Sequence, residues 1–298
     1  RKGGALSRPR VKTWHGWSRR RLWVTAGLGV AAVAVCHRAW VDIFSIAVRD
    51  EEFAHILLVP AVVAWMVVVR RDRIRRCQPR GEWIGPVMVA AGGVLSWFGY
   101  EHAHQSLWHG GAVLVLVGSV FTALGTRVLW RFLPAVGALA FMVPVPGRLR
   151  TAVAIPLQTA TAETTQTLLE LFGVAVARSG NVLYLNDLPI HIAENCNGMR
   201  MVFALVLVSY AFAFGTPLRG YARALILVLS PLTAILLNVL RLTPTVLLYA
   251  HADRGVATWF DRLGGWLMLV LAFVLLLGVI QALRWALVPV TRYTLAYD

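Results

Sequence analysis

The sequence predicts an all-α polytopic membrane protein with about eight transmembrane helices and a small extracytoplasmic β-hairpin. Hydrophobic residues make up 58% of the 298-residue chain and charged residues only 14%, whereas soluble domains carry about 25% charge. The mean hydropathy is +0.66, and the apolar residues come in long runs and not at amphipathic spacing. These observations exclude a single soluble globular domain.

Eight apolar runs are expected to cross the membrane, because a hydrocarbon core of roughly 30 Å needs about 20 apolar residues per helix. Polar residues interrupt the run Thr151–Phe172, which we interpret as an amphipathic helix at the interface or lining the bundle. No small-residue cleavage site follows the first run, so we expect a retained helix there. The expected spans are Leu22–Val41, Ala54–Val69, Trp83–Tyr100, Leu107–Leu124, Val128–Val143, Gly198–Phe214, Arg223–Leu248 and Trp259–Leu283.

The arginines predict the orientation of these spans. One cluster, Arg19–Arg21, precedes the first run, and a second, between Arg70 and Arg80, follows the second run. Both belong in the cytoplasm by the positive-inside rule. Most of the net charge of +15 is therefore a topology and lipid-headgroup signal, and we expect membrane lipids, but no nucleic acid, as partners. The expected location is the cytoplasmic (inner) membrane.

The chain is expected to form one transmembrane domain between two short tails. Residues 1–21 form a basic cytoplasmic tail, residues 22–288 the domain, and residues 289–298 a second cytoplasmic tail. Residues 144–197 are expected to lie outside the membrane or at its outer interface.

A β-hairpin is predicted within this outer segment. The runs Val182–Leu185 and Leu188–Ile192 flank the polar pair Asn186-Asp187, a pattern typical of two strands and a tight turn. The hairpin would bring the chain to Cys196, next to the start of the sixth span.

Cys196 is a candidate nucleophile. Three scattered cysteines, Cys36, Cys77 and Cys196, are too few for a disulfide framework or a metal cluster. Cys196 lies at a predicted helix start, where free backbone N–H groups stabilise a reactive thiolate. The alternative interpretation is a small, buried and inert cysteine.

Arg241 is a charge inside an apolar run, in Leu237-Asn238-Val239-Leu240-Arg241-Leu242. Such a charge costs several kcal/mol unless it faces a polar cavity or a partner. Asn238, three residues earlier, is expected on the same helical face. The alternative is that the arginine extends to the outer headgroups.

Further titratable residues are expected on the outer side of the membrane. Asp261 begins the last span, where a helix-capping role is the alternative. His55 enters the second span from outside, and His191 and His251 lie on that side as well. A thiol, a guanidinium and a titratable group together are the components of acyl transfer.

Four segments resemble motifs of the exosortase/archaeosortase family of membrane transpeptidases, and the resemblance spans most of the chain. They are Glu51-Glu52-Phe53-Ala54-His55, Val143-Pro144-Val145-Pro146, Ala193-Glu194-Asn195-Cys196-Asn197-Gly198-Met199-Arg200 and Asn238-Val239-Leu240-Arg241. The resemblance implies that Cys196 is the nucleophile and that Arg241 is its catalytic partner, which stabilises the oxyanion.

The sequence departs from the family pattern at two positions. Asn197 stands where Ser is usual. Asp261, or Arg262 after a one-residue shift, occupies the position of a His in exosortases and an Arg in archaeosortases. Three interpretations remain: Asp261 orients Arg241 or another base, His55 transfers the proton, or the enzyme is impaired. We assign substrate binding to Asn195, Asn197, Asn238 and Arg262.

The resemblance implies a cysteine transpeptidase that cuts C-terminal sorting signals from exported proteins. Such PEP-CTERM-like signals consist of a short motif, a transmembrane helix and a basic tail. A thioester would then pass to an amine or a lipid-linked acceptor, on the extracytoplasmic face and without a metal or cofactor. The alternatives are a catalytically impaired protein that binds sorting signals and a transporter of an anionic solute, although inverted repeats typical of transporters are not evident.

Overall fold

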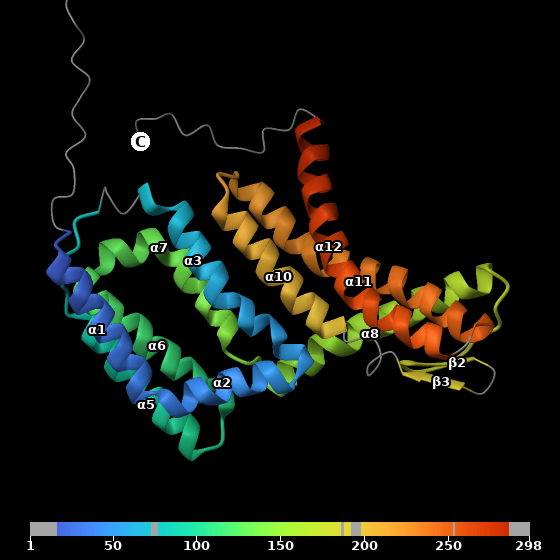
Figure 1. Cartoon of the computed structure of the whole chain (residues 1–298), viewed down its shortest axis with the longest axis horizontal. Coiled ribbons are helices and arrows are strands. Elements are labelled where there is room, and N and C mark those ends of the chain that lie inside the picture. Colours follow the sequence, from blue (N-terminus) through green and yellow to red (C-terminus); the bar gives the residue numbers. More distant parts are fainter. Residues whose placement is uncertain (1–16, 73–76, 186–187, 192–197, 253, 286–298) are drawn as a thin grey trace, which may run out of the picture.

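The computed structural model in Figure 1 is a helical protein with a small sheet at one side. The structure describes residues 17–72, 77–185, 188–191, 198–252 and 254–285. Helices α1 to α7 form one group, and α8, α10, α11 and α12 form a second group that extends to the right in Figure 1, with the sheet beneath it. The expected helical class and the presence of a small sheet are confirmed.

The first expected span is broken into two helices. α1 (Arg19–Val35) and α2 (His37–Arg49) meet at Cys36 with a bend of 76°, so the expected span Leu22–Val41 is a bent pair of helices and not one straight helix. α2 is amphipathic and buries one face, including Trp40 and Ile43. The signal was present in the sequence, because His37, Arg38 and Asp42 interrupt the apolar residues where the chain turns.

In the described part of the chain, two short 3-10 helices and four α-helices complete the N-terminal group. They are η1 (Glu51–Leu58), α3 (Val59–Val69), α5 (Ile84–Glu101), α6 (Gln105–Leu124), α7 (Thr126–Ala138) and η2 (Leu139–Met142). Glu82, in the loop before α5, binds the start of α7, since its carboxylate accepts hydrogen bonds from the backbone N–H (3.3 Å) and the hydroxyl of Thr126. These hydrogen bonds favour the ionised carboxylate and hold the pKa of Glu82 below its ordinary value.

The polar segment after the Val143-Pro144-Val145-Pro146 motif is a continuous helix, α8 (Gly147–Leu171), as expected. It is bent by 90° from the helix pair α7–η2. Thr161 and Thr165 face the protein interior and are almost fully buried. The polar residues that interrupt the apolar run therefore lie partly inside the protein.

The small sheet has three strands in the order β1-β2-β3. They are β1 (Ala177–Ser179), β2 (Val182–Leu185) and β3 (Leu188–His191). The antiparallel register pairs Leu185 with Leu188 and Val182 with His191, which confirms the predicted hairpin. β1 was not expected, because a three-residue strand carries too little alternation to be recognised from sequence.

Three helices complete the C-terminal group: α10 (Gly198–Gly215), α11 (Gly220–His251) and α12 (Arg254–Trp285). One apolar cluster joins α10, α11 and α12 and includes Leu205, Ile226 and Leu237. A second cluster joins α11 to α8 and the sheet through Leu242, Leu169 and Leu183. α11 thus packs on different partners along its length.

Among the described residues, three helical segments are long and apolar enough to cross a membrane: Glu52–Val69, Gln105–Leu124 and Gly220–Tyr249. The two bent pairs raise this number to five if each pair is one span. The sequence-based count of eight stays a prediction.

Candidate active site

Arg241 lies within α11 and is almost fully buried, with an exposed fraction of 2%. It is 21 residues from Gly220, the start of the helix, which corresponds to about 32 Å along the helix axis. A hydrocarbon core is about 30 Å thick. If Gly220 lies at the inner boundary, Arg241 therefore reaches the outer boundary and not the centre of the membrane.

Two apolar clusters meet at Arg241. Leu237 belongs to the cluster with α10 and α12, and Leu242 belongs to the cluster with α8 and the sheet. On the α12 side, the aliphatic part of Arg241 lies against Gly264, where an added Cβ would be 3.1 Å from Cγ and 3.3 Å from Cδ. The arginine is therefore held in a position fixed by packing on both sides.

Asn238 is also buried, with an exposed fraction of 6%, three residues before Arg241 on α11. Residues three apart share a helix face, as expected from the sequence. Within the described part of the chain, the buried Oδ1 of Asn238 accepts no hydrogen bond. A buried acceptor of this kind is suited to bind a donor from a ligand.

Asp261 and Arg262 both belong to α12, and their side chains are outside the described part of the structure. Position 261 is three residues before Gly264 and shares its helix face, whereas positions 262 and 264 do not face the same way. Because Gly264 contacts Arg241, the backbone places position 261 on the face of α12 that packs on α11.

Cys196, Asn195 and Asn197 lie outside the described residues, so the structure does not place them. The elements on either side are described: β3 ends at His191 and α10 begins at Gly198. The sheet itself packs on α11, since Leu183 and Leu185 share a cluster with Leu242.

His55 is buried in η1 and contacts α10. Its ring stacks on Phe203 with the two ring centroids 5.1 Å apart, and its Nδ1 lies 3.2 Å from the carbonyl oxygen of Glu52. These contacts place His55 against the second turn of α10, whereas Arg241 is held at the α11–α12 contact. His251 is exposed in the last turn of α11, where its Nδ1 bonds the carbonyl oxygen of Leu247. The side chain of His191 is outside the described part.

Two polar pairs of the structure were not predicted from the sequence. Glu52 accepts a 2.7 Å ion-pair hydrogen bond from Arg150 in the first turn of α8, and Asp42 pairs with the buried His109 at 3.0 Å. No sequence pattern links these partners, because 98 and 67 residues separate them. The first pair fixes α8 beside the motif that contains His55. No cluster of three metal-ligating side chains was found within the described ranges.

A sequence model of the transmembrane exosortases (Exosortase_EpsH) matches residues 40–278. The chain belongs to this family. The match includes the segments of His55, Cys196, Arg241 and Asp261, and it confirms the membrane class and the family resemblance. Comparisons with curated proteins and with solved structures gave no match to this exosortase-family protein.

Proposed function

We propose that this protein is a cysteine transpeptidase that cleaves C-terminal sorting signals of exported proteins and transfers the exported part to an acceptor. The single observation that carries the proposal is the placement of Arg241, which is buried at the contact between α11 and α12 beside the sheet that precedes Cys196. Family membership supports the reaction class.

The proposed reaction proceeds through a thioester. The Cys196 thiolate attacks the scissile carbonyl carbon, and the C=O electrons form an oxyanion that the Arg241 guanidinium stabilises by hydrogen bonds and charge. The oxyanion collapses, the C–N bond breaks, and the leaving amine takes a proton. An acceptor amine or a lipid-linked acceptor then attacks the thioester, loses its proton and regenerates the thiolate.

For the third catalytic position we propose Asp261, which shares a helix face with Gly264 and would orient Arg241. His55, which lies on η1 and stacks on Phe203 of α10, would supply protons once its ring moves toward the substrate. Asn238, whose Oδ1 is a buried free acceptor within the described chain, would bind a backbone N–H of the sorting signal, together with Asn195, Asn197 and Arg262.

Substitution of the nucleophile tests the proposal. Wild type or Cys196→Ala is co-expressed with a secreted reporter that carries at its C-terminus a sorting signal encoded in the same genome. Cleavage is measured by the mass of the reporter. We expect no cleavage in Cys196→Ala and full cleavage in the matched control Cys36→Ala. Unchanged processing in Cys196→Ala would overturn the assignment.

Arg241→Lys should be nearly inactive, because an ammonium does not replace a planar bidentate guanidinium.

Thiol trapping separates an active enzyme from a protein that only binds sorting signals. In a Cys36→Ala/Cys77→Ala background, Cys196 is the single thiol and its alkylation rate is measured against pH. An activated thiolate reacts rapidly near neutral pH. A rate no faster than that of a free cysteine peptide would favour the binding protein.

We further propose eight spans in the inner membrane, with both tails in the cytoplasm and the active site on the outer face. Single cysteines at Asp72 and His104 are introduced in a cysteine-free background and labelled in intact cells with a membrane-impermeant maleimide. Both positions are exposed at helix ends. His104→Cys should be labelled, and Asp72→Cys should react only after lysis. The reverse pattern would overturn the orientation.

A further inference from the structure

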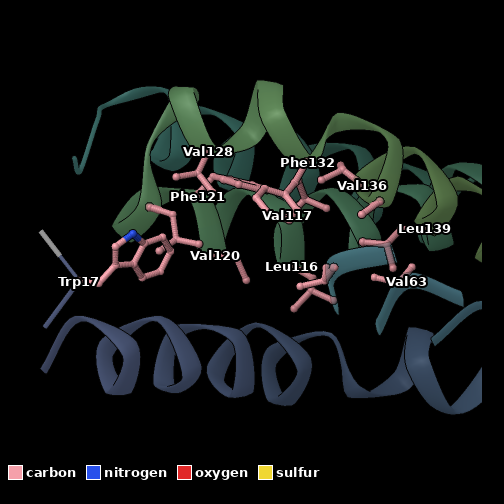
Figure 2. A pocket seen from close by; sticks show the side chains of 13 residues that line it. Trp17, Val63, Leu116, Val117, Val120, Phe121, Val128, Phe132, Val136 and Leu139 are labelled. Carbon is pink, nitrogen blue, oxygen red and sulfur yellow. The ribbon is translucent and has the colours of Figure 1, made fainter. Parts of the chain in front are cut away.

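An apolar cavity of about 410 Å³ is lined by Trp17, which precedes α1, and by residues of α3, α6, α7 and η2. Figure 2 shows Trp17 at one end of the cavity and Val63 and Leu139 at the other, with side chains of α6 and α7 between them. All 13 lining residues are apolar or aromatic. A second hollow of about 690 Å³ runs over α1 and shares Trp17, Leu116, Val120 and Leu124 with the first.

We propose that this cavity binds one acyl chain of an anionic phospholipid whose headgroup is held by the arginines around Trp17. The site is separate from the α11–α12 region and does not depend on the proposed transpeptidase activity. Three properties of the cavity favour a lipid as its ligand: its size, the charge at the Trp17 end, and the contacts that form that end.

The size of the cavity fits an acyl chain and not a helix. A methylene group needs about the space of a water molecule, roughly 30 Å³, so 410 Å³ holds about 14 methylenes. A transmembrane helix 30 Å long and 10 Å wide occupies more than roughly 2,000 Å³. The transmembrane part of a sorting signal therefore does not fit into this space.

The charge at the Trp17 end fits an anionic headgroup. Arg19 and Arg20 are exposed two and three residues after Trp17, and Arg127 is exposed one residue before the lining residue Val128. Arg80 donates its backbone N–H to Leu124, another lining residue. The acidic residues Asp72 and Glu82 also lie at this end, but the four arginines outnumber them. Each arginine near a membrane surface favours anionic lipid.

The contacts at this end form a fixed rim. The indole Nε1 of Trp17 donates a 3.0 Å hydrogen bond to the carbonyl oxygen of Cys77, and Arg21 donates to the carbonyl oxygen of Pro79. Both bonds hold the loop that follows α3 against the start of α1. A tryptophan with its polar edge hydrogen-bonded and its ring in an apolar cavity is typical of the membrane–water interface.

The test uses the full-length protein, purified and exchanged into nanodiscs that contain equal amounts of phosphatidylglycerol and phosphatidylcholine. After extraction into mild detergent, retained lipid is measured by native mass spectrometry. We expect about one phosphatidylglycerol per protein in wild type and far less in Val120→Phe, because the larger side chain projects into the cavity and obstructs the acyl chain. Arg19→Gln/Arg20→Gln should reduce retention about fivefold for each arginine removed.

Matched controls keep the test decisive. Val94→Phe adds the same ring at an exposed position of α5, and Arg38→Gln/Arg49→Gln removes two exposed arginines from α2; both controls should retain lipid as wild type does. Equal lipid retention in Val120→Phe and wild type would show that the lipid does not bind in the cavity. Equal retention of phosphatidylglycerol and phosphatidylcholine would show that the arginines do not select an anionic headgroup. A diazirine side chain introduced at Leu116 should crosslink to lipid. Crosslinks to a sorting signal or to a second copy of the chain, and not to lipid, would also overturn the proposal.

Discussion

At the scale of single residues, Arg241 is informative because charge is rare within the apolar runs. A buried guanidinium is costly. If Gly220 lies at one membrane boundary, about 32 Å of helix places Arg241 near the opposite boundary, where this cost is smaller. Packing, and not only charge, then fixes its geometry, since Gly264 leaves room for its aliphatic part and no more.

Gly264→Ala tests this packing. The added methyl group would lie 3.1 Å from Cγ of Arg241, so the arginine must shift by a few tenths of an ångström, while the overall stability should change by less than about 1 kcal/mol. Since small displacements of catalytic groups have large effects on rate, we expect cleavage of the sorting-signal reporter to slow about tenfold.

Gly278→Ala is the control on the same helix, because no atom lies within 4 Å of its added Cβ. It should leave cleavage unchanged and stabilise α12 by about 0.5–1 kcal/mol. If Gly264→Ala cleaves the reporter as fast as Gly278→Ala does, the position of Arg241 does not limit the reaction.

At the scale of elements, α5 and α6 make the closest helix contact in the N-terminal group. Glycines at a spacing of seven residues, Gly85, Gly92 and Gly99 on α5, lie against the backbone of α6. An added Cβ at Gly92 would be 2.8 Å from the backbone N of Val115. Small residues allow such approach, which favours association of helices in a membrane.

Gly92 and Gly93 provide a matched pair for this contact. Gly92→Ala forces the two backbones apart and should lower the free energy of unfolding by about 1–3 kcal/mol. Gly93→Ala has no atom within 4 Å of the new methyl group and should raise it by about 0.5–1 kcal/mol. Thermal unfolding in detergent measures both changes. Equal melting temperatures for the two variants would show that the helices do not approach as closely as described.

At the scale of the whole molecule, side chains form hydrogen bonds between the N-terminal and C-terminal groups of helices. Arg70, at the end of α3, is buried and donates to the carbonyl oxygens of Phe214 on α10 and Arg131 on α7. The hydroxyl of Tyr210 on α10 donates a 3.0 Å bond to the carbonyl oxygen of Pro134 on α7. These bonds satisfy backbone carbonyls near helix ends and inside α7, and they connect elements from both groups.

Arg70→Gln is expected to weaken this junction. Loss of hydrogen bonds from a buried charged donor should reduce the free energy of unfolding by about 1.5–3 kcal/mol. Its exposed neighbour Arg71 is the control, and Arg71→Gln should change stability by less than about 0.5 kcal/mol. Thermal unfolding and limited proteolysis between the two groups report the effect. A destabilisation in Arg71→Gln as large as in Arg70→Gln would contradict the role of this junction.

The sequence by itself determined the membrane class, the helical runs, the hairpin at Val182–Leu185 and Leu188–Ile192, and the unusual position of Arg241. These features follow from hydropathy, local alternation and the cost of a buried charge, which act within short stretches of chain. Tertiary structure alone decided the ion pair of Glu52 with Arg150, the packing of Arg241 on Gly264, and the cavity beside Trp17. Each of these depends on which helices come together, and contacts between residues far apart in the chain have no local pattern.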